Sequence, residues 1–247
     1  MTESIGIIGA GRFGRFWGNA LNRYYPVRIF DTDETCRART EGIGEWADLQ
    51  TCFKQSFVFL TIPISEIGPF LQANAYMLRS GSIILDCASV KIRVSEWFKQ
   101  YLPTDSFYAL SHPLFGPDSA RQGLKGHRIT LMPGRIPLAR YQKLVQIFSQ
   151  ELSLQVINIS PEEHDRLMAH NLSLIHLLGR TCHKMELERV PLIMDSLRKL
   201  NGISKVVMND SEQLFRDFFR FNPYSTELCR DFVRTFEYLL ENIAVDH

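Results

Sequence analysis

The 247-residue sequence lacks the features of several specialised protein classes. No apolar run approaches the roughly 20 residues that a membrane-spanning helix needs, and no basic stretch precedes the first apolar run, as it would in a signal peptide. The five cysteines form no CxxC pair, which argues against a disulfide framework and a zinc site. Because 28 Lys and Arg balance 27 Asp and Glu, the total charge does not favour nucleic-acid or membrane binding. These absences predict a reduced, cytoplasmic protein with no metal, nucleic-acid or membrane partner.

The first part of the chain, to about residue 159, alternates short apolar runs with stretches of helical periodicity. The candidate strands are residues 4–8, 27–30, 57–60, 82–86, 107–110, 128–132 and 154–159. Strands with few polar positions, separated by helices, are typical of a parallel sheet that is covered on both faces. They predict an α/β fold with a doubly wound, Rossmann-type, mostly parallel sheet.

The pattern changes at Ser160, where the sequence SPEE combines an N-cap serine, a proline at the first helical position and a glutamate for a capping box. No convincing strand follows. Helices are predicted at about 162–189, 191–201, 203–221 and 225–243. We therefore divide the chain into a nucleotide-binding domain, 1–159, and a small all-helical domain, 160–247. A domain this small and rich in Phe and Leu is expected to bury apolar surface against a partner.

The glycine-rich segment GAGRFG has GxGxxG spacing between a predicted strand and a predicted helix. In this context the glycines permit a tight turn, close approach of a diphosphate and close packing of helix on strand. Asp31 ends the second strand, where a carboxylate accepts hydrogen bonds from ribose hydroxyls and repels a 2′-phosphate. The pattern favours NAD, with NADP as the weaker alternative. The residues assigned to cofactor binding are Gly9, Gly11, Arg12, Phe13, Gly14 and Asp31.

Among the seven histidines, only His112 directly follows a predicted sheet strand. Ligands of open α/β sheets bind beyond the carboxyl ends of the strands, and a histidine there suits proton transfer near neutral pH. Ser89 follows the preceding strand at the same edge. On position alone, a loop histidine that bonds only to backbone is an equally good interpretation of His112.

Four segments, in order along the chain, resemble the prephenate and arogenate dehydrogenase family. SHPLFGPDS (111–119) resembles the family's HPMFGP signature, and DCASVK (86–91) resembles its D-x-x-SVK segment. EEHDRLMAHNLSLIHLLGR (162–180) is similar to its HD motif with a second histidine twelve residues later. DSEQLFRDFFRFNPYS (210–225) is similar to a C-terminal segment of the family.

The resemblance implies oxidative decarboxylation of prephenate to 4-hydroxyphenylpyruvate in tyrosine biosynthesis, with hydride transfer to NAD. It also implies that the helical domain forms a homodimer and closes over the active site. Carried onto this sequence, His112 accepts the proton of the substrate hydroxyl, and Ser89 hydrogen-bonds that hydroxyl or the histidine. His176 contacts the substrate, while His164 supports the start of its helix.

Two positions depart from the family pattern. Many bacterial members have a substrate-binding arginine where this chain has Val206, which leaves the adjacent Lys205 as the candidate cation, although a lysine lacks the bidentate fork. Gln122 is neutral where an acidic residue could meet the amino group of arogenate, which favours prephenate. Arogenate dehydrogenase is the alternative, followed by another two-domain NAD(P) reductase and a non-catalytic NAD-sensing module.

Overall fold

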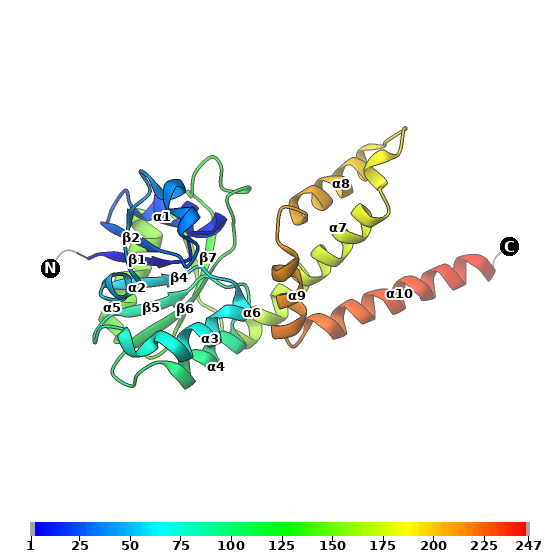
Figure 1. Cartoon of the computed structure of the whole chain (residues 1–247). Coiled ribbons are helices and arrows are strands. Elements are labelled where there is room, and N and C mark those ends of the chain that lie inside the picture. The colour runs from blue at the N-terminus through cyan, green and yellow to red at the C-terminus, as the bar shows by residue number, and fades with distance from the viewer. Residues whose placement is uncertain (1–2, 246–247) are drawn as a thin grey trace. The chain divides into compact units, whose positions relative to one another are not determined.

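The computed structural model describes residues 3–245, which fold into two units (Figure 1). Unit 1 is Met1–Pro161 and unit 2 is Glu162–His247. Unit 1 combines strands and helices, whereas the described part of unit 2 contains helices and no strand.

Unit 1 contains one eight-stranded sheet with the strand order β3-β2-β1-β4-β5-β6-β7-β8. Neighbouring strands are parallel, except that β6 and β7 are antiparallel. The mostly parallel, Rossmann-type sheet predicted from the sequence is therefore confirmed. The strands are β1 (Ile5–Ile8), β2 (Val27–Phe30), β3 (Glu45–Trp46), β4 (Phe57–Leu60), β5 (Ile83–Asp86), β6 (Phe107–Pro113), β7 (Arg128–Pro133) and β8 (Gln155–Ile157).

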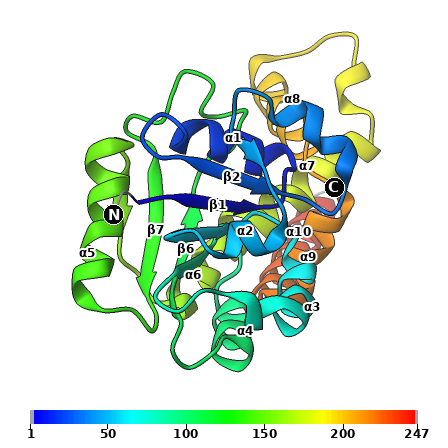
Figure 2. The same cartoon turned by 60° about the vertical axis from the view of Figure 1, so that its left-hand side comes forward.

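Helices cover both faces of this sheet, because its central strands are buried and apolar on both sides. On one face, the Trp17 ring of α1 contacts Phe59 of β4 and Phe148, which follows α5. On the other face, Phe98 of α4 packs edge-on against Tyr108 of β6, and α3 lies beside α4 (Figure 2). The helices of unit 1 are α1 (Arg12–Leu21), α2 (Leu49–Phe53), α3 (Ile64–Asn74), α4 (Ile92–Tyr101) and α5 (Leu138–Gln146), the last continued by a π-helical turn, Ile147–Glu151.

Strand β6 is longer than the sequence predicted. We expected it to end at residue 110 and to be followed by a loop that contains His112, but it continues to Pro113. The extension comes from antiparallel pairing, with His112 opposite Thr130 and Pro113 opposite Ile129. Pro113 lies at the end of the strand, where its missing N–H removes no interior ladder bond. His112 is therefore fixed by a sheet rather than by a loop.

The described residues of unit 2 form helices joined by turns and contain no strand. Its helices are α6 (Pro161–Met168), α7 (Ile175–Lys184), α8 (Asp195–Val207), α9 (Glu212–Phe221) and α10 (Ser225–Val245), with a π-helical segment, Ala169–Leu174, between α6 and α7. The single helix predicted at 203–221 is wrong. Helix α8 ends at Val207, and a new helix begins after Ser211, whose hydroxyl accepts a hydrogen bond from Leu214 N at 3.1 Å.

Short polar contacts hold the helices of unit 2 together. The Asn222 side chain donates to the carbonyl of Asp165 at 2.7 Å, and the Ser173 and Ser225 hydroxyls lie 2.6 Å apart. Gly179 lets α7 and α8 approach closely, because an added Cβ would lie 2.5 Å from Val207. Within residues 3–245, every helix is too short or too polar to span a bilayer.

Candidate active site

The glycine loop after β1 has a backbone that only glycine accommodates. Gly9 has a φ of +108°, and an added Cβ would lie 2.9 Å from the carbonyl of Thr61. An added Cβ at Gly14 would lie 1.9 Å from the carbonyl oxygen of Gly9. These two glycines therefore fix the tight turn and the contact of α1 with the loop.

The same loop leaves room and hydrogen-bond donors for an anion. An added Cβ at Gly11 would meet no described atom within 4 Å, and no described side chain caps the N-terminus of α1, which begins there. The free N–H groups and positive end of a helix bind diphosphates. The Asp31 carboxylate faces the loop, since it accepts hydrogen bonds from Ala10 N at 2.6 Å and from Asp33 N at 2.9 Å. The arrangement fits the diphosphate and ribose of a dinucleotide.

The two other loop residues assigned to the cofactor make contacts of different kinds. Arg12 forms an ion pair with Asp118, which lies in the connection between β6 and β7. Phe13 packs its ring on Trp17, with the centroids 6.0 Å apart, and joins the core of unit 1. A direct cofactor contact for these side chains stays a prediction.

A buried ionic network joins the ends of β5 and β6. Lys91 forms an ion pair with Asp86, at the end of β5, and donates to the carbonyl of Ser111 at 2.7 Å. The carboxylate also accepts from Ser111 N at 3.2 Å and from Ala88 N at 3.0 Å. Burial raises the pKa of Asp86, while the Lys91 ammonium opposes that shift. The network binds the loop that carries Ser89 to the strand that carries His112.

Ser89 and His112, the predicted catalytic pair, lie on the two segments that the network joins. His112 follows Ser111 directly on β6 and is 9% exposed. The Ser89 hydroxyl is buried, yet it has no hydrogen-bond partner among residues 3–245. A buried hydroxyl without a partner costs free energy, so it indicates a position that a ligand completes.

Two predicted substrate-binding residues have exposed side chains. Gln122 is exposed in the connection between β6 and β7. Lys205 is exposed on α8, whose buried side consists of Asn201, Ser204 and Val207 and packs on α7. The structure therefore does not bring Lys205 to the buried surroundings of His176. Their roles stay predictions.

His176 lies buried on α7 against α9 and the turn that precedes it. Its Nε2 atom is 3.5 Å from the Asp210 carboxylate, and its ring packs edge-on against Phe218, with centroids 4.9 Å apart. Burial, and secondarily the charge of Arg180, lowers the pKa of His176 to about 4. The imidazole is therefore neutral near pH 7. Its Nδ1 atom is buried with no hydrogen-bond partner in the described chain.

His164 is also buried, where its Nδ1 lies 2.8 Å from the Asp165 carboxylate. The backbone carbonyl of Asp165 accepts the hydrogen bond of Asn222, so the HD motif contacts the NP segment that precedes α10. These contacts agree with a supporting role for His164, which stays a prediction.

Several residues that make these contacts in the two units were not singled out from the sequence. Lys91 lies in the DCASVK segment, and its spacing from Asp86 across the turn at the end of a strand could have indicated that the two side chains meet. Asp118 and Arg180 gave no such signal, because their partners are distant or on other elements. In the part of the chain that the structure describes, no three His, Cys, Asp or Glu side chains are grouped to hold a metal ion, and the five cysteines are free thiols.

The fold and the glycine loop define the class of Rossmann-type nucleotide-binding proteins that carry a helical C-terminal unit. Residues 27–139 match the family model "Prephenate dehydrogenase, nucleotide-binding domain", and residues 181–245 match "TYRAAT1-like, C-terminal domain". These matches, together with the relatives below, support the prephenate and arogenate dehydrogenase family.

Individual relatives agree with this assignment. Arogenate dehydrogenase 1 of Arabidopsis thaliana is 27% identical over 95% of this chain and 38% of its own length. Arogenate dehydrogenase 2 of the same plant is 26% identical over 94% of this chain and 68% of its own. The structure of Aquifex aeolicus prephenate dehydrogenase, in complex with hydroxyphenyl propionate and NAD+, aligns with a TM-score of 0.77 at 19% identity, over 100% of this chain and 92% of the other. The chain thus spans well under half the length of the first of these relatives.

Proposed function

We propose that the protein is an NAD-dependent dehydrogenase that oxidatively decarboxylates a cyclohexadiene substrate of the prephenate type. The carrying observation is the buried, unpartnered hydroxyl of Ser89, on the loop that the Asp86–Lys91–Ser111 network ties to the strand of His112. The match to the prephenate dehydrogenase nucleotide-binding domain and the similarity to arogenate dehydrogenases support the same reaction. The glycine loop and Asp31 lie at the same edge of the sheet, where they would bind the cofactor.

The proposed reaction divides its tasks among few residues. NAD, when bound, supplies the hydride acceptor. His112 accepts the proton of the ring hydroxyl, and Ser89 hydrogen-bonds that hydroxyl or the histidine and so orients the reacting group. Each Asp31 oxygen accepts one backbone N–H and retains a second lone pair for the ribose hydroxyls. The substrate loses hydride and carbon dioxide and becomes aromatic, so the protein mainly aligns groups and removes a proton.

Prephenate is the substrate that the side chains favour, with 4-hydroxyphenylpyruvate as the product. Gln122 is uncharged and exposed, and it offers no carboxylate to the amino group of arogenate. Arogenate is the second candidate, because the two Arabidopsis relatives are named arogenate dehydrogenases. For unit 2 we retain His176 as a substrate contact and Lys205 as the candidate cation. A cytoplasmic location remains part of the proposal.

The test is a set of initial-rate assays with prephenate and arogenate, each with NAD and with NADP, on the purified chain and on His112→Asn. We expect NADH formation to be fastest with prephenate and NAD. His112→Asn should lower kcat by about 10²–10⁴-fold, the usual contribution of a general base, and leave NAD affinity nearly unchanged. Saturable NAD binding without turnover of either substrate would instead support a cofactor-sensing module.

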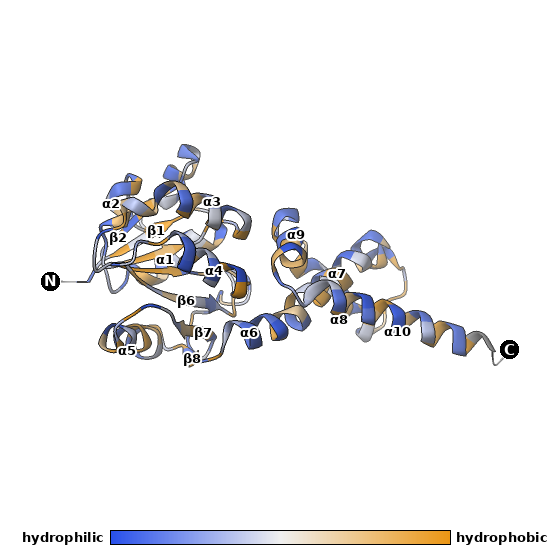
Figure 3. Cartoon of the chain, turned by 90° about the horizontal axis from the view of Figure 1, so that it is seen from below, coloured by the Kyte–Doolittle hydropathy of each residue, from blue (hydrophilic) through white to orange (hydrophobic). Residues whose placement is uncertain are grey.

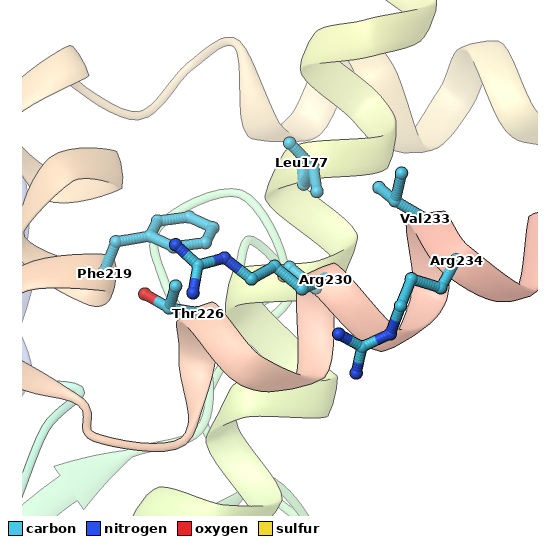
Figure 4. A pocket seen from close by; sticks show the side chains of 7 residues that line it. Leu177, Phe219, Thr226, Arg230, Val233 and Arg234 are labelled. Atoms are coloured by element: carbon cyan, nitrogen blue, oxygen red, sulfur yellow. The ribbon is translucent and has the colours of Figure 1, made fainter.

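We also propose a homodimer through unit 2. Helix α10 exposes Phe232, Phe236, Leu239, Leu240 and Ile243, at 36–65% exposure and at three- and four-residue intervals. Figure 3 shows hydrophobic stretches alternating with hydrophilic ones along α10. Beside this apolar stripe lies a hollow of about 450 Å³, which is lined by Leu177, Phe219, Thr226, Cys229, Arg230, Val233 and Arg234 (Figure 4).

The charges along α10 favour an antiparallel partner helix. Arg230 and Arg234 lie in its N-terminal half, and Glu237 and Glu241 follow seven residues after each. Two copies of α10 that pair antiparallel would bring the arginines of one near the glutamates of the other. The same pairing would bury the apolar stripes against each other.

A further inference from the structure

Arg180 joins α7 to the segment that precedes and begins α9. Its side chain is only 15% exposed, and Nη1 donates to Glu212 at 2.7 Å. Its Nη2 atom lies 3.2 Å from the carbonyl oxygen of Asp210 and 3.3 Å from that of Ser211. The planar guanidinium presents several donors in one rigid group, so it can hold this turn through three acceptors at once.

The turn that Arg180 holds is also the turn that contacts His176. Asp210 places its carboxylate oxygen 3.5 Å from His176 Nε2. Phe215 lies nearly parallel to the imidazole, at 16° and 6.3 Å, while the Arg180 guanidinium lies 4.6 Å from the centre of the same Phe215 ring. His176 and Arg180 are at positions i and i+4 of α7, on one side of the helix. Arg180 therefore shares with His176 the groups that set the orientation of the imidazole.

We propose that Arg180 is a positioning residue for His176: it holds Asp210 on Nε2 and thereby leaves Nδ1 as a hydrogen-bond acceptor. A neutral imidazole has one N–H and one lone pair, and Asp210, as an acceptor, takes the N–H. The lone pair then lies on Nδ1, the buried atom that has no partner within residues 3–245. The charged groups around the ring are Arg180 on α7, Asp210 in the turn and Glu212 behind Arg180.

This assignment has a consequence for the substrate, and that consequence rests on the proposed function, in which His176 contacts the substrate. The substrate group that meets Nδ1 must be a donor, because a carboxylate or a keto oxygen would face a lone pair. Prephenate has its ring hydroxyl as the one such donor, whereas arogenate also has an ammonium, so this contact favours arogenate where Gln122 favours prephenate. The lowered pKa of His176 supports the same neutral state, since burial and the nearby Arg180 charge both disfavour the imidazolium.

The first measurement is NMR of the full chain with 15N-labelled histidine, assigned by loss of the His176 signal in His176→Gln. We expect the wild-type ring to carry its proton on Nε2 and to stay neutral down to about pH 5. Arg180→Leu should give a mixture of tautomers and a higher pKa, because both the fixed turn and the cation are lost. Arg180→Lys keeps the charge without the fork and should give an intermediate spectrum. The control, Arg198→Leu, removes an exposed arginine of α8 and should change neither the tautomer nor the pKa of His176.

The second measurement is steady-state kinetics of the same variants. Loss of one oriented hydrogen bond should raise KM for the substrate roughly three- to tenfold in Arg180→Leu, with kcat nearly unchanged. A wild-type proton on Nδ1 overturns the proposal, and so does an unchanged His176 spectrum in Arg180→Leu. If Arg180→Leu does not fold, Arg180→Lys decides between the same outcomes. Absence of turnover by the wild-type chain would refute the proposed function, while the spectrum still decides the role of Arg180.

Discussion

Replacement of Lys91 by methionine should destabilise unit 1 strongly. Lys91 and Asp86 are both 0% exposed, so removal of the ammonium leaves a buried carboxylate without its counterion. Breaking a buried ion pair by removal of one partner costs about 3–5 kcal/mol, because the remaining charge keeps its desolvation penalty. Methionine has a similar length to lysine, so little of this loss would come from a cavity.

The assay is urea denaturation followed by tryptophan fluorescence. All three tryptophans (Trp17, Trp46 and Trp97) lie in unit 1, so the signal reports this unit alone. The expected result is a lower midpoint with an unchanged slope against urea. The control is the double variant Lys91→Met/Asp86→Asn, which removes both charges. It should recover at least about 1 kcal/mol, because an uncharged amide in the same place costs less to bury.

The loss of stability of Lys91→Met relative to wild type should also become smaller as the pH is lowered. Burial already raises the pKa of Asp86, and removal of the opposing ammonium raises it further. A carboxyl whose pKa is higher in the folded state than in the unfolded state destabilises the fold. The full destabilisation is present at pH values above the folded-state pKa, and none is present at pH values below the unfolded-state pKa of about 4. The difference from wild type is therefore largest at pH 7 and smaller towards pH 4. A loss under about 1 kcal/mol at pH 7, or a deficit that grows in acid, would refute this reasoning.

Three further outcomes test the proposals. Ser89→Ala should change the free energy of unfolding by less than about 0.5 kcal/mol, yet lower kcat/KM roughly three- to tenfold in initial-rate assays; equal rates would remove Ser89 from the site. Asp31→Asn should weaken NAD binding and lower the ratio of kcat/KM with NAD to kcat/KM with NADP by about tenfold; an unchanged ratio contradicts the ribose contact. Phe236→Asp should shift the mass in light scattering from a dimer to a single chain of 28.5 kDa, whereas Tyr238→Asp, on the other side of α10, should not.

Much of unit 1 could be predicted from the sequence, because local patterns determine it. Strand β4 is a continuous apolar run at 57–60, and the glycine spacing placed the loop after β1. The two-residue strand β3 has no such run and was missed. The true end of β6 depends on its pairing with β7, which no local pattern encodes.

The polar contacts within each unit were harder to predict, because they depend on tertiary structure. Lysine is rarely buried, and Lys91 is buried only because Asp86 and Ser111 meet it inside unit 1. The contact of Arg180 with Asp210 spans 30 positions of sequence. It also depends on the break between α8 and α9, which no proline or glycine marks.

The reversed direction of β7 keeps one long connection at the sheet edge where His112 lies. A parallel β7 would require a crossover from one edge of the sheet to the other, and the chain would leave the edge where His112 lies. Because β7 is antiparallel to β6, the connection at 114–127 starts and ends at that edge and carries Asp118 and Gln122 with it. Phe115 and Ala120 of this connection belong to the core of unit 1, whereas residues 121–123 are exposed, so changes of length at 121–123 alter neither a strand nor a core residue. The exposed part of the connection can therefore differ in length as well as in residue type, while the core side chains stay in place.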